Sequence, residues 1–349
     1  MSELKLASDL IGAIYTFQSL GGICIICNST HEDLFETVPD FKNSKWIGII
    51  DQSKIIQLHL PLYALPKKLT SKRENKFNVP ISDAVEKHNP KMIALLGYPR
   101  ISTFGVDIAS VCKLLEDEYH RPALAIGFDG KNFYDDGIQE IYLASLFRLT
   151  EAQQQKKPFS LGVLGVTPFD FEMSAIDELK VRYTRKGWQK IFCVGMDSGL
   201  DIFRDASSLE ENLVVAPSGF PAARFLQKTF GIPFHIDYPL FMSEMPIHIE
   251  TGMNYDRILI VHQQFKANSF RHWLQTQYPR ARIVCASFFM MQNYLCQPYD
   301  RALKSTDDFT RLVYRNKFNC IIADKHLKKF LPENWNGDFF EADHFAISE

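Results

Sequence analysis

The sequence lacks several features that would assign a protein to a nucleic-acid-binding, exported or membrane class. Its densest basic stretch, Lys67 to Arg73, is short and typical of a solvated loop, so we expect no nucleic-acid partner. Residues 1–5 do not begin an export signal, and no stretch approaches the roughly 20 apolar residues of a membrane span. We therefore expect a cytoplasmic protein without a membrane partner.

Two common catalytic motifs are also missing. The chain contains neither the G-x-S-x-G turn that presents a serine nucleophile nor the G-x-x-x-x-G-K-[ST] loop that holds nucleotide phosphates. These absences argue against a serine hydrolase and against ATP-driven chemistry within this chain.

Cysteine is present but poorly arranged for a metal site. The count of seven is odd, and the chain is long enough to fold without disulfides, so we expect free thiols in a reducing compartment. Cys24 and Cys27 have C-x-x-C spacing, but on a strand residues three apart point to opposite faces. A core role for both thiols is favoured, because no second C-x-x-C exists. The alternative is that Cys27, near His31, contributes a metal ligand shared with a partner chain.

The bulk composition is that of a folded protein with several domains. The chain has 349 residues, of which 46% are hydrophobic and 23% charged, with a formal net charge of −2, which excludes extensive disorder. Its length predicts two or three lobes, at roughly 100–200 residues per domain.

Apolar runs of strand length alternate with amphipathic stretches of helix length, which is typical of doubly wound α/β folds. The predicted helices span residues 10–20, 107–119, 175–186, 220–230 and 269–278, and Gly231 is expected to end the fourth of them. The predicted strands span residues 22–27, 46–50, 91–97, 123–128, 160–166, 190–194, 211–216, 257–262, 281–286 and 319–323.

Two breaks divide this pattern. Residues 151–158 are polar and rich in glutamine and lysine, and a second break falls near residues 242–254. We therefore predict three doubly wound, Rossmann-like parallel-sheet lobes around a central cleft. The predicted lobes span residues 1–152, 158–241 and 255–349.

Several stretches stand out by their residues and their order along the chain. They are Gly105-Val106-Asp107-Ile108 followed by Arg121-Pro122, Leu161 to Pro168, Asn212 to Gly219 continuing to Gly231-Ile232-Pro233-Phe234, and Tyr255 to Val261. In this order they resemble the nitrogenase component 1 family, which includes the nitrogenase molybdenum–iron protein subunits, cofactor-assembly relatives and tetrapyrrole reductases. The resemblance implies a three-lobed α/β fold and assembly with a homologous subunit or with a second copy.

The chain departs from this family at the expected metal ligands. Family members with an inter-subunit iron–sulfur cluster place cysteines at three points of the first lobe, where this chain has Ala7 or Ser8, Thr30 to Glu32, and Tyr98 to Arg100. The cysteine that anchors the nitrogenase cofactor is replaced by Ala216. Because such clusters are held chiefly by thiolates, the resemblance implies a cluster only if a partner chain shares it.

Polar residues after predicted strands are the first candidates for a ligand site, since ligands gather beyond the carboxyl ends of parallel strands. His31 and Glu32 follow the first strand, although the same residues could simply begin a helix. Tyr98 and Arg100 follow another strand, and Arg100 could bind a carboxylate or phosphate.

Further candidates follow strands of the second and third lobes. Ser218 and Gly219 open a helix whose backbone N–H groups could hold an anion. Arg224 lies on that helix and could neutralise the anion, or it could be an ordinary surface charge. His262 ends a strand, and His344 belongs to a stretch similar to one near the nitrogenase cofactor. Both histidines could line the cleft or be ordinary core residues.

Two functions remain open, together with a third in reserve. The resemblance implies an oxidoreductase subunit that works with a homologous cluster-bearing subunit and an ATP-dependent iron-protein reductase. The alternative is a non-catalytic scaffold or a protein that binds a tetrapyrrole-like or metallocofactor-like molecule at a degenerate cluster site. A third possibility is a structural partner that stabilises a catalytic paralogue.

Overall fold

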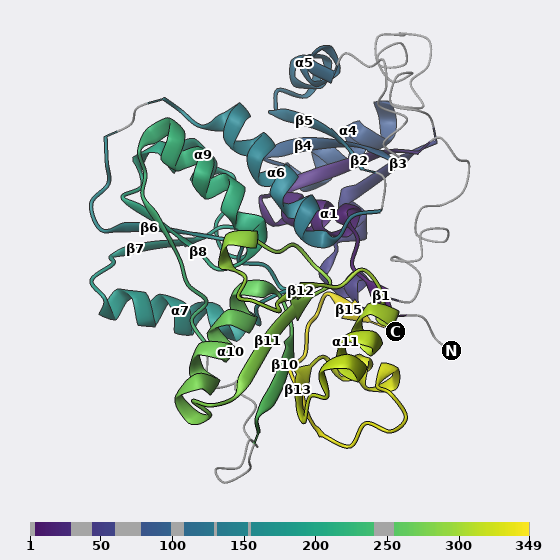
Figure 1. Cartoon of the computed structure of the whole chain (residues 1–349). Coiled ribbons are helices and arrows are strands. Elements are labelled where there is room, and N and C mark those ends of the chain that lie inside the picture. Colours follow the sequence, from purple (N-terminus) through teal and green to yellow (C-terminus); the bar gives the residue numbers. More distant parts are fainter. Residues whose placement is uncertain are drawn as a thin grey trace. The chain divides into compact units, whose positions relative to one another are not determined.

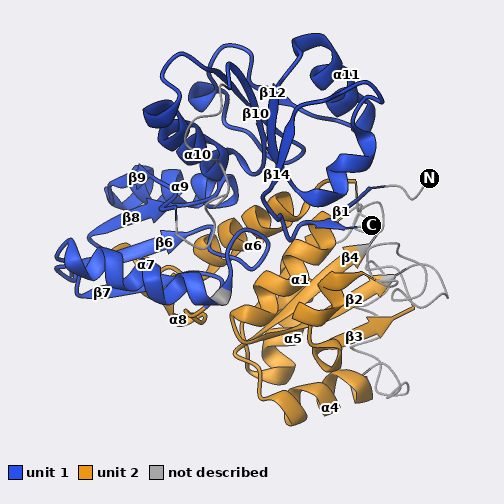
Figure 2. Cartoon of the chain, turned by 90° about the horizontal axis from the view of Figure 1, so that it is seen from below, with its two compact units in different colours: residues 1–6, 155–196, 208–349 blue, residues 7–154, 197–207 orange. Residues whose placement is uncertain are grey.

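The structure is a computed structural model that describes residues 4–28, 44–59, 78–98, 108–128, 131–152, 155–240 and 255–348. Its described part contains three parallel β-sheets with helices against them, which confirms the predicted fold class of several parallel-sheet α/β lobes (Figure 1). The chain divides into two compact units, shown in Figure 2. Unit 1 comprises residues 1–6, 155–196 and 208–349, and unit 2 comprises residues 7–154 and 197–207.

The sheet of unit 2 has four parallel strands in the order β3-β2-β4-β5. Every residue of β2 from Ile23 to Cys27 is fully buried, as expected for a continuous apolar run in a parallel sheet. The elements of this unit are α1 (Asp9–Ser19), β2 (Gly22–Asn28), η1 (Lys45–Ile49), η2 (Gln52–Lys54), β3 (Ile55–Leu58), α4 (Asn78–His88), β4 (Met92–Tyr98), α5 (Ile108–Tyr119), β5 (Ala123–Gly127), α6 (Tyr134–Leu149) and α8 (Asp201–Arg204).

The predicted strand over residues 46–50 is wrong. This segment forms the 3-10 helix η1, and the strand that pairs with β2 is β3, a few residues later. Trp46 and Ile50 are buried while Gly48 between them is exposed. The N–H groups of Ile47 and Ile50 donate to the carbonyl oxygens of Ser44 and Ile47, three residues earlier, which is the bonding pattern of a 3-10 helix and not of a sheet.

Helices α1 and α6 of unit 2 pack closely through two glycines. A Cβ atom added to Gly12 would lie 2.1 Å from the carbonyl oxygen of Tyr134, and one added to Gly137 would lie 1.9 Å from that of Asp9. The two backbones therefore approach so closely that neither position has room for a side chain.

A short segment from the second half of the chain completes unit 2. Residues 197–207 contain α8 and return to the unit formed by residues 7–154. Phe203 packs against Tyr142 of α6, with ring centroids 5.9 Å apart, and Asp201 pairs with Lys91 at 3.2 Å. Residue 203 is thus part of the core of unit 2, although it is far along the chain from the rest of that unit.

The second sheet, in unit 1, has the parallel order β7-β6-β8-β9. Helix α9 ends where Gly231 adopts a left-handed conformation (φ 67°), which confirms the predicted stop. The elements are β6 (Ser160–Leu164), α7 (Met173–Arg185), β7 (Lys190–Cys193), β8 (Glu211–Val214), η7 (Pro217–Gly219), α9 (Phe220–Phe230) and β9 (Phe234–Ile236). The 3-10 helix η6 (Asp205–Ser208) lies at the end of the segment that returns to unit 2.

The third sheet, also in unit 1, has the parallel order β12-β11-β10-β13-β14. Helix α10 begins at Gln264, five residues before the predicted start, because the side chain of Gln263 accepts a hydrogen bond from the Phe265 N–H and caps the helix. The elements are β10 (Arg257–Val261), α10 (Gln264–Gln277), β11 (Arg282–Ser287), η9 (Asn293–Leu295), β12 (Arg301–Ala302), α11 (Thr306–Asn316), β13 (Cys320–Ala323), η10 (Lys325–Phe330) and β14 (Asp338–Glu341).

The two ends of the chain pair with each other in unit 1. Strand β1 (Lys5–Leu6) lies antiparallel to β15 (Ile347–Ser348). Among the helices that the structure describes, none is both long and apolar enough to cross a lipid bilayer.

A buried histidine cluster as candidate functional site

Unit 1 contains two places where the strand order reverses, and these are the preferred ligand positions of open α/β sheets. In the second sheet the reversal falls between β6 and β8, and in the third sheet between β10 and β13. Gln263, directly after β10, donates a hydrogen bond from Nε2 to the carbonyl oxygen of Val215, directly after β8, at 3.1 Å. The two reversal points of unit 1 are therefore joined at their carboxyl ends.

His262 lies at this junction and is 2% exposed. Its Nδ1 accepts a hydrogen bond from the Gln263 N–H at 2.8 Å, so Nε2 carries the proton and donates to the carbonyl oxygen of Asp343 at 3.2 Å. Burial, together with the nearby charges of His344 and Lys266, holds the pKa of His262 well below its usual range. His262 is thus a neutral imidazole with both nitrogens engaged.

His344 stacks on His262, with ring centroids 4.2 Å apart and an interplanar angle of 18°. Its Nε2 lies 3.3 Å from Oδ1 of Asp170, a residue that follows β6. Its backbone N–H donates to Oδ2 of Asp324, which follows β13, at 2.9 Å. We call His262, His344, Asp170 and Asp324 the buried histidine cluster; it draws on the ends of β6, β10 and β13 and on the segment before β15.

The turn that begins α9 lies beside the turn after β6. Gly165 has φ +88°, and a Cβ atom there would meet the Cβ of Ala216 at 2.9 Å. Ser218 and Thr167, one in each turn, are fully buried, and neither hydroxyl has a hydrogen-bond partner among the described residues. Gly219 packs its backbone against Leu164, and anion binding by the turn of Ser218 and Gly219 stays a prediction.

Arg224 lies away from this junction, on the exposed side of α9. Its guanidinium sits over the ring of Phe220, 5.7 Å from the centroid. This is the surface alternative considered for Arg224, and no contact with the buried histidine cluster is observed among the described residues.

The candidates of the first lobe fall largely outside the described residues. His31, Glu32 and Arg100 lie there, and Tyr98 is described only as the last residue of β4. Cys27 is buried in the hydrophobic core of unit 2, and burial raises the pKa of its thiol to about 12. Cys24 does not belong to that core cluster, as expected for residues on opposite faces of a strand.

The sequence prediction identified the two histidines but not the residues that hold them. Asp324 comes directly after β13 and caps η10, and Asp170 follows the turn after β6. The rule that pointed to His262, a polar residue at a strand end, would also have found Asp324. Nothing local marks Asp170, since its role depends on a contact with a residue 174 positions away.

The residues present do not fit an iron–sulfur cluster held by this chain alone. Among the described residues, no group of three or more His, Cys, Asp or Glu side chains could hold a metal ion. All seven cysteines are free, and Cys285 and Cys320 of the third sheet are buried with raised pKa values. Ala216 offers no donor atom at the junction.

Comparisons with known proteins agree with this fold. Residues 73–245, about half of the chain, match the family described as nitrogenase component 1 type oxidoreductase. The solved structure "Nitrogenase Cp1 at pH 6.5" superposes with a TM-score of 0.67 at 9% identity, covering 99% of this chain and 87% of that chain. The structure "Nitrogenase Cp1 at pH 5" gives a TM-score of 0.65 at 12% identity, covering 98% and 84%.

No curated protein sequence matches the chain. The family match and the likeness of fold nevertheless agree with each other and with the order of motifs in the sequence. The chain is a nitrogenase component 1-like family member.

Proposed function

We propose that this chain is a ligand-poor subunit of a nitrogenase component 1-like oxidoreductase. A homologous subunit supplies the thiolates of any iron–sulfur cluster in the complex. A separate ATP-dependent iron protein supplies the electrons. The chain contributes the scaffold of parallel-sheet lobes and the polar groups at their strand ends.

One observation supports this division of roles above all others, namely the donor set. A cluster needs several thiolates, yet Cys24, Cys27, Cys193, Cys285 and Cys320 are buried in the packed interior. A buried thiol with a raised pKa is a poor metal ligand, because the thiolate is the form that binds. The family fold persists here without the family's ligands, which fits a subunit whose partner carries the metal.

The proposal is tested by anaerobic purification of the chain alone and after co-expression with a homologous subunit that has the family cysteines. We expect the chain alone to be colourless and without stoichiometric iron. The co-expressed complex should contain iron and show the absorption of an iron–sulfur cluster.

Matched variants locate the ligands in that complex. Cys27→Ser in this chain should leave the iron content unchanged, whereas replacing the cysteines of the homologous subunit should remove the iron. Stoichiometric iron in the chain expressed alone would contradict the proposal, as would loss of iron from the Cys27→Ser complex.

A second candidate function is a non-catalytic scaffold that holds an organic ligand without redox chemistry. The state of His262 favours it, because both ring nitrogens are engaged within the protein and neither faces a reactant. This function predicts that the complex does not stimulate ATP hydrolysis by an iron protein. It also predicts that denaturing extraction releases an organic molecule detectable by mass spectrometry.

A further inference from the structure

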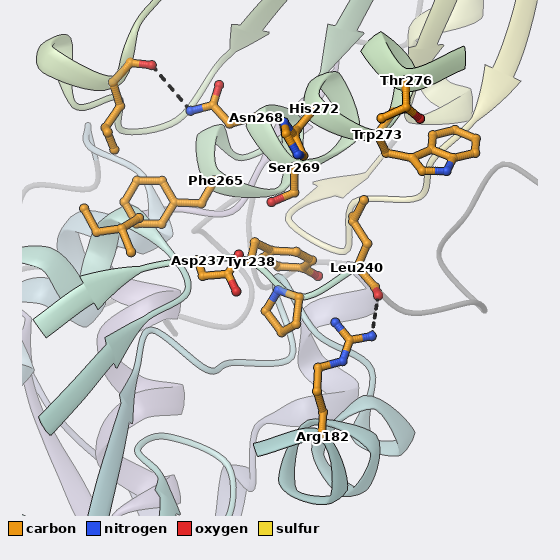
Figure 3. Close-up of a pocket in the computed structure, with 13 residues that line it drawn as sticks. Arg182, Asp237, Tyr238, Leu240, Phe265, Asn268, Ser269, His272, Trp273 and Thr276 are labelled. Carbon is orange, nitrogen blue, oxygen red and sulfur yellow. Dashed lines mark hydrogen bonds between the residues drawn. The ribbon is translucent and has the colours of Figure 1, made fainter. Parts of the chain in front are cut away.

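A cavity of about 620 Å³ opens between the second and third sheets of unit 1, and none of the four residues of the buried histidine cluster lines it. Its volume lies within the roughly 300–1,000 Å³ of typical small-molecule sites. Figure 3 shows that two walls face each other across it. One wall comes from α7 and the residues after β9, and the other comes from α10.

The wall from the second sheet carries two opposite charges. Arg182, on α7, donates a hydrogen bond from Nη2 to the carbonyl oxygen of Leu240 at 2.8 Å and pairs with Glu178 of the same helix at 3.6 Å, and these two contacts fix the direction of its guanidinium. Asp237 is held in place because its backbone N–H donates to Val214 and its carboxylate accepts from the hydroxyl of Tyr183 at 3.3 Å.

These two charges lie close enough together to act on the same phenol. Burial raises the pKa of Tyr183, the carboxylate of Asp237 raises it further, and the guanidinium of Arg182 opposes that rise. A positively charged hydrogen-bond donor, Arg182, and a negatively charged hydrogen-bond acceptor, Asp237, therefore lie on one side of the cavity.

The rest of the cavity is mainly apolar and aromatic. Tyr238 lies at its floor, with its ring stacked on Phe171 and its hydroxyl donated to the carbonyl oxygen of Asp170. Phe265 and Trp273 of α10 form the opposite wall, with the side chain of Ser269 between them in Figure 3. Such walls bind a flat apolar group, and rigid aromatic residues do so at little entropic cost.

From this arrangement we infer that the cavity is a binding site for a small amphoteric molecule with an aromatic or other apolar side group, of the amino-acid class. Its carboxylate pairs with Arg182, its ammonium group pairs with Asp237, and its side group packs between Tyr238, Phe265 and Trp273. This site is independent of the metal chemistry proposed above.

Three related probes test the inference by isothermal titration calorimetry on the full chain: L-tryptophan, indole-3-acetate and tryptamine. They share the indole group but carry both charges, only the carboxylate, and only the ammonium group. We expect L-tryptophan to bind more tightly than either singly charged probe by about tenfold, the usual effect of one hydrogen bond to a charged group.

Two substitutions separate the charges. Arg182→Met should weaken L-tryptophan and indole-3-acetate by about tenfold and leave tryptamine unchanged. Asp237→Asn should weaken L-tryptophan and tryptamine by a similar factor and leave indole-3-acetate unchanged. Arg185→Met and Asp177→Asn, at exposed positions of the same helix α7, are the matched controls and should change nothing.

Ser269→Phe provides a variant that alters neither charge. The larger side chain fills the cavity from α10 and should abolish binding of all three probes. This readout remains if Asp237→Asn disturbs folding through Tyr183. The inference is overturned if no probe binds at millimolar concentration, if Ser269→Phe binds as the natural chain does, or if Arg182→Met weakens all three probes equally.

Discussion

At the scale of single residues, Asp300 and Arg271 form a buried pair of opposite charges. The two carboxylate oxygens of Asp300 each lie 2.8 Å from Nη1 of Arg271, and the two side chains are 1% and 4% exposed. The same carboxylate accepts hydrogen bonds from the backbone N–H groups of Cys285 and Gln297. Asp300 therefore links α10, β11 and the turn before β12.

Asp300→Asn leaves the guanidinium of Arg271 buried without a counter-charge. We expect the free energy of unfolding to fall by about 3–5 kcal/mol, as for other buried pairs that lose one partner. Urea denaturation measures this change. Glu341→Gln is the control, because the pair of Glu341 with Lys328 is half exposed and should contribute less than about 1 kcal/mol.

His262 gives the molecule a predictable response to acid. Its pKa is held well below the usual value of about 6.5, so between these two values the unfolded chain binds a proton that the folded chain does not. The contribution of the neutral His262 to the free energy of unfolding is therefore fully present above about pH 6.5. It is lost as the pH falls, by up to about 1.4 kcal/mol per pH unit.

Denaturation curves between pH 7 and pH 5 measure this loss. His262→Gln should reduce the slope of stability against pH, whereas His59→Gln, at an exposed position, should leave it unchanged. An identical slope in the natural chain and in His262→Gln would contradict the assignment of a neutral buried His262.

The two histidines of the cluster could be singled out in the sequence for different reasons. His262 lies at the end of a predicted strand, and His344 lies in a stretch that resembles the family. Their partners could not, since Asp170 and Asp324 meet His344 only through tertiary contacts across two sheets. The sequence also gave no sign that His262 and His344 stack on each other. That the candidates of the first lobe take part in a site stays a prediction.

At the scale of elements, the contact between α1 and α6 depends on the absence of side chains at Gly12 and Gly137. Gly137→Ala places a Cβ atom within 1.9 Å of the carbonyl oxygen of Asp9 and must push the helices apart. We expect a loss of about 3 kcal/mol in the free energy of unfolding, at the upper end for overpacked cores. Gly48→Ala, in the same unit with nothing within 4 Å of the new Cβ, should be nearly neutral.

Elements were predicted well where one physical signal dominated. The buried parallel strands β2, β4 and β10 are continuous apolar runs, and helix α9 ends at a glycine that adopts positive φ. The prediction failed over residues 46–50, because a short apolar run has the same composition in a strand and in a 3-10 helix. The backbone hydrogen bonds distinguish the two, since the N–H groups of Ile47 and Ile50 bond to carbonyl oxygens three residues earlier.

At the scale of the whole molecule, residues 197–207 belong to unit 2 although they interrupt the chain of unit 1. Phe203→Ala should therefore destabilise unit 2, by about 3–5 kcal/mol as for other buried phenylalanines. Hydrogen exchange with mass spectrometry should show lower protection in α6 and unchanged protection in β6.

Leu226→Ala is the matched variant for this experiment, because Leu226 is buried on α9 of unit 1. It should lower protection in β6 and β8 and leave α6 unchanged. Equal loss of protection in α6 from both variants would show that the two units do not unfold separately. The three predicted lobe boundaries stay a prediction. The place of residues 197–207 could not be predicted, because it depends on the contact of Phe203 with Tyr142, which no local pattern indicates.

Because residues 197–207 belong to unit 2, they also determine the order in which the two units can fold during synthesis on the ribosome. Domains fold as units during synthesis, but unit 2 lacks Phe203 until that residue has emerged, after β6 and β7 have already been made. Folding of unit 1 is completed later, because β1 can pair with β15 only after residues 347–348 have been synthesised. A nascent chain stalled between residues 154 and 197 should therefore expose apolar surface that chaperones can recognise.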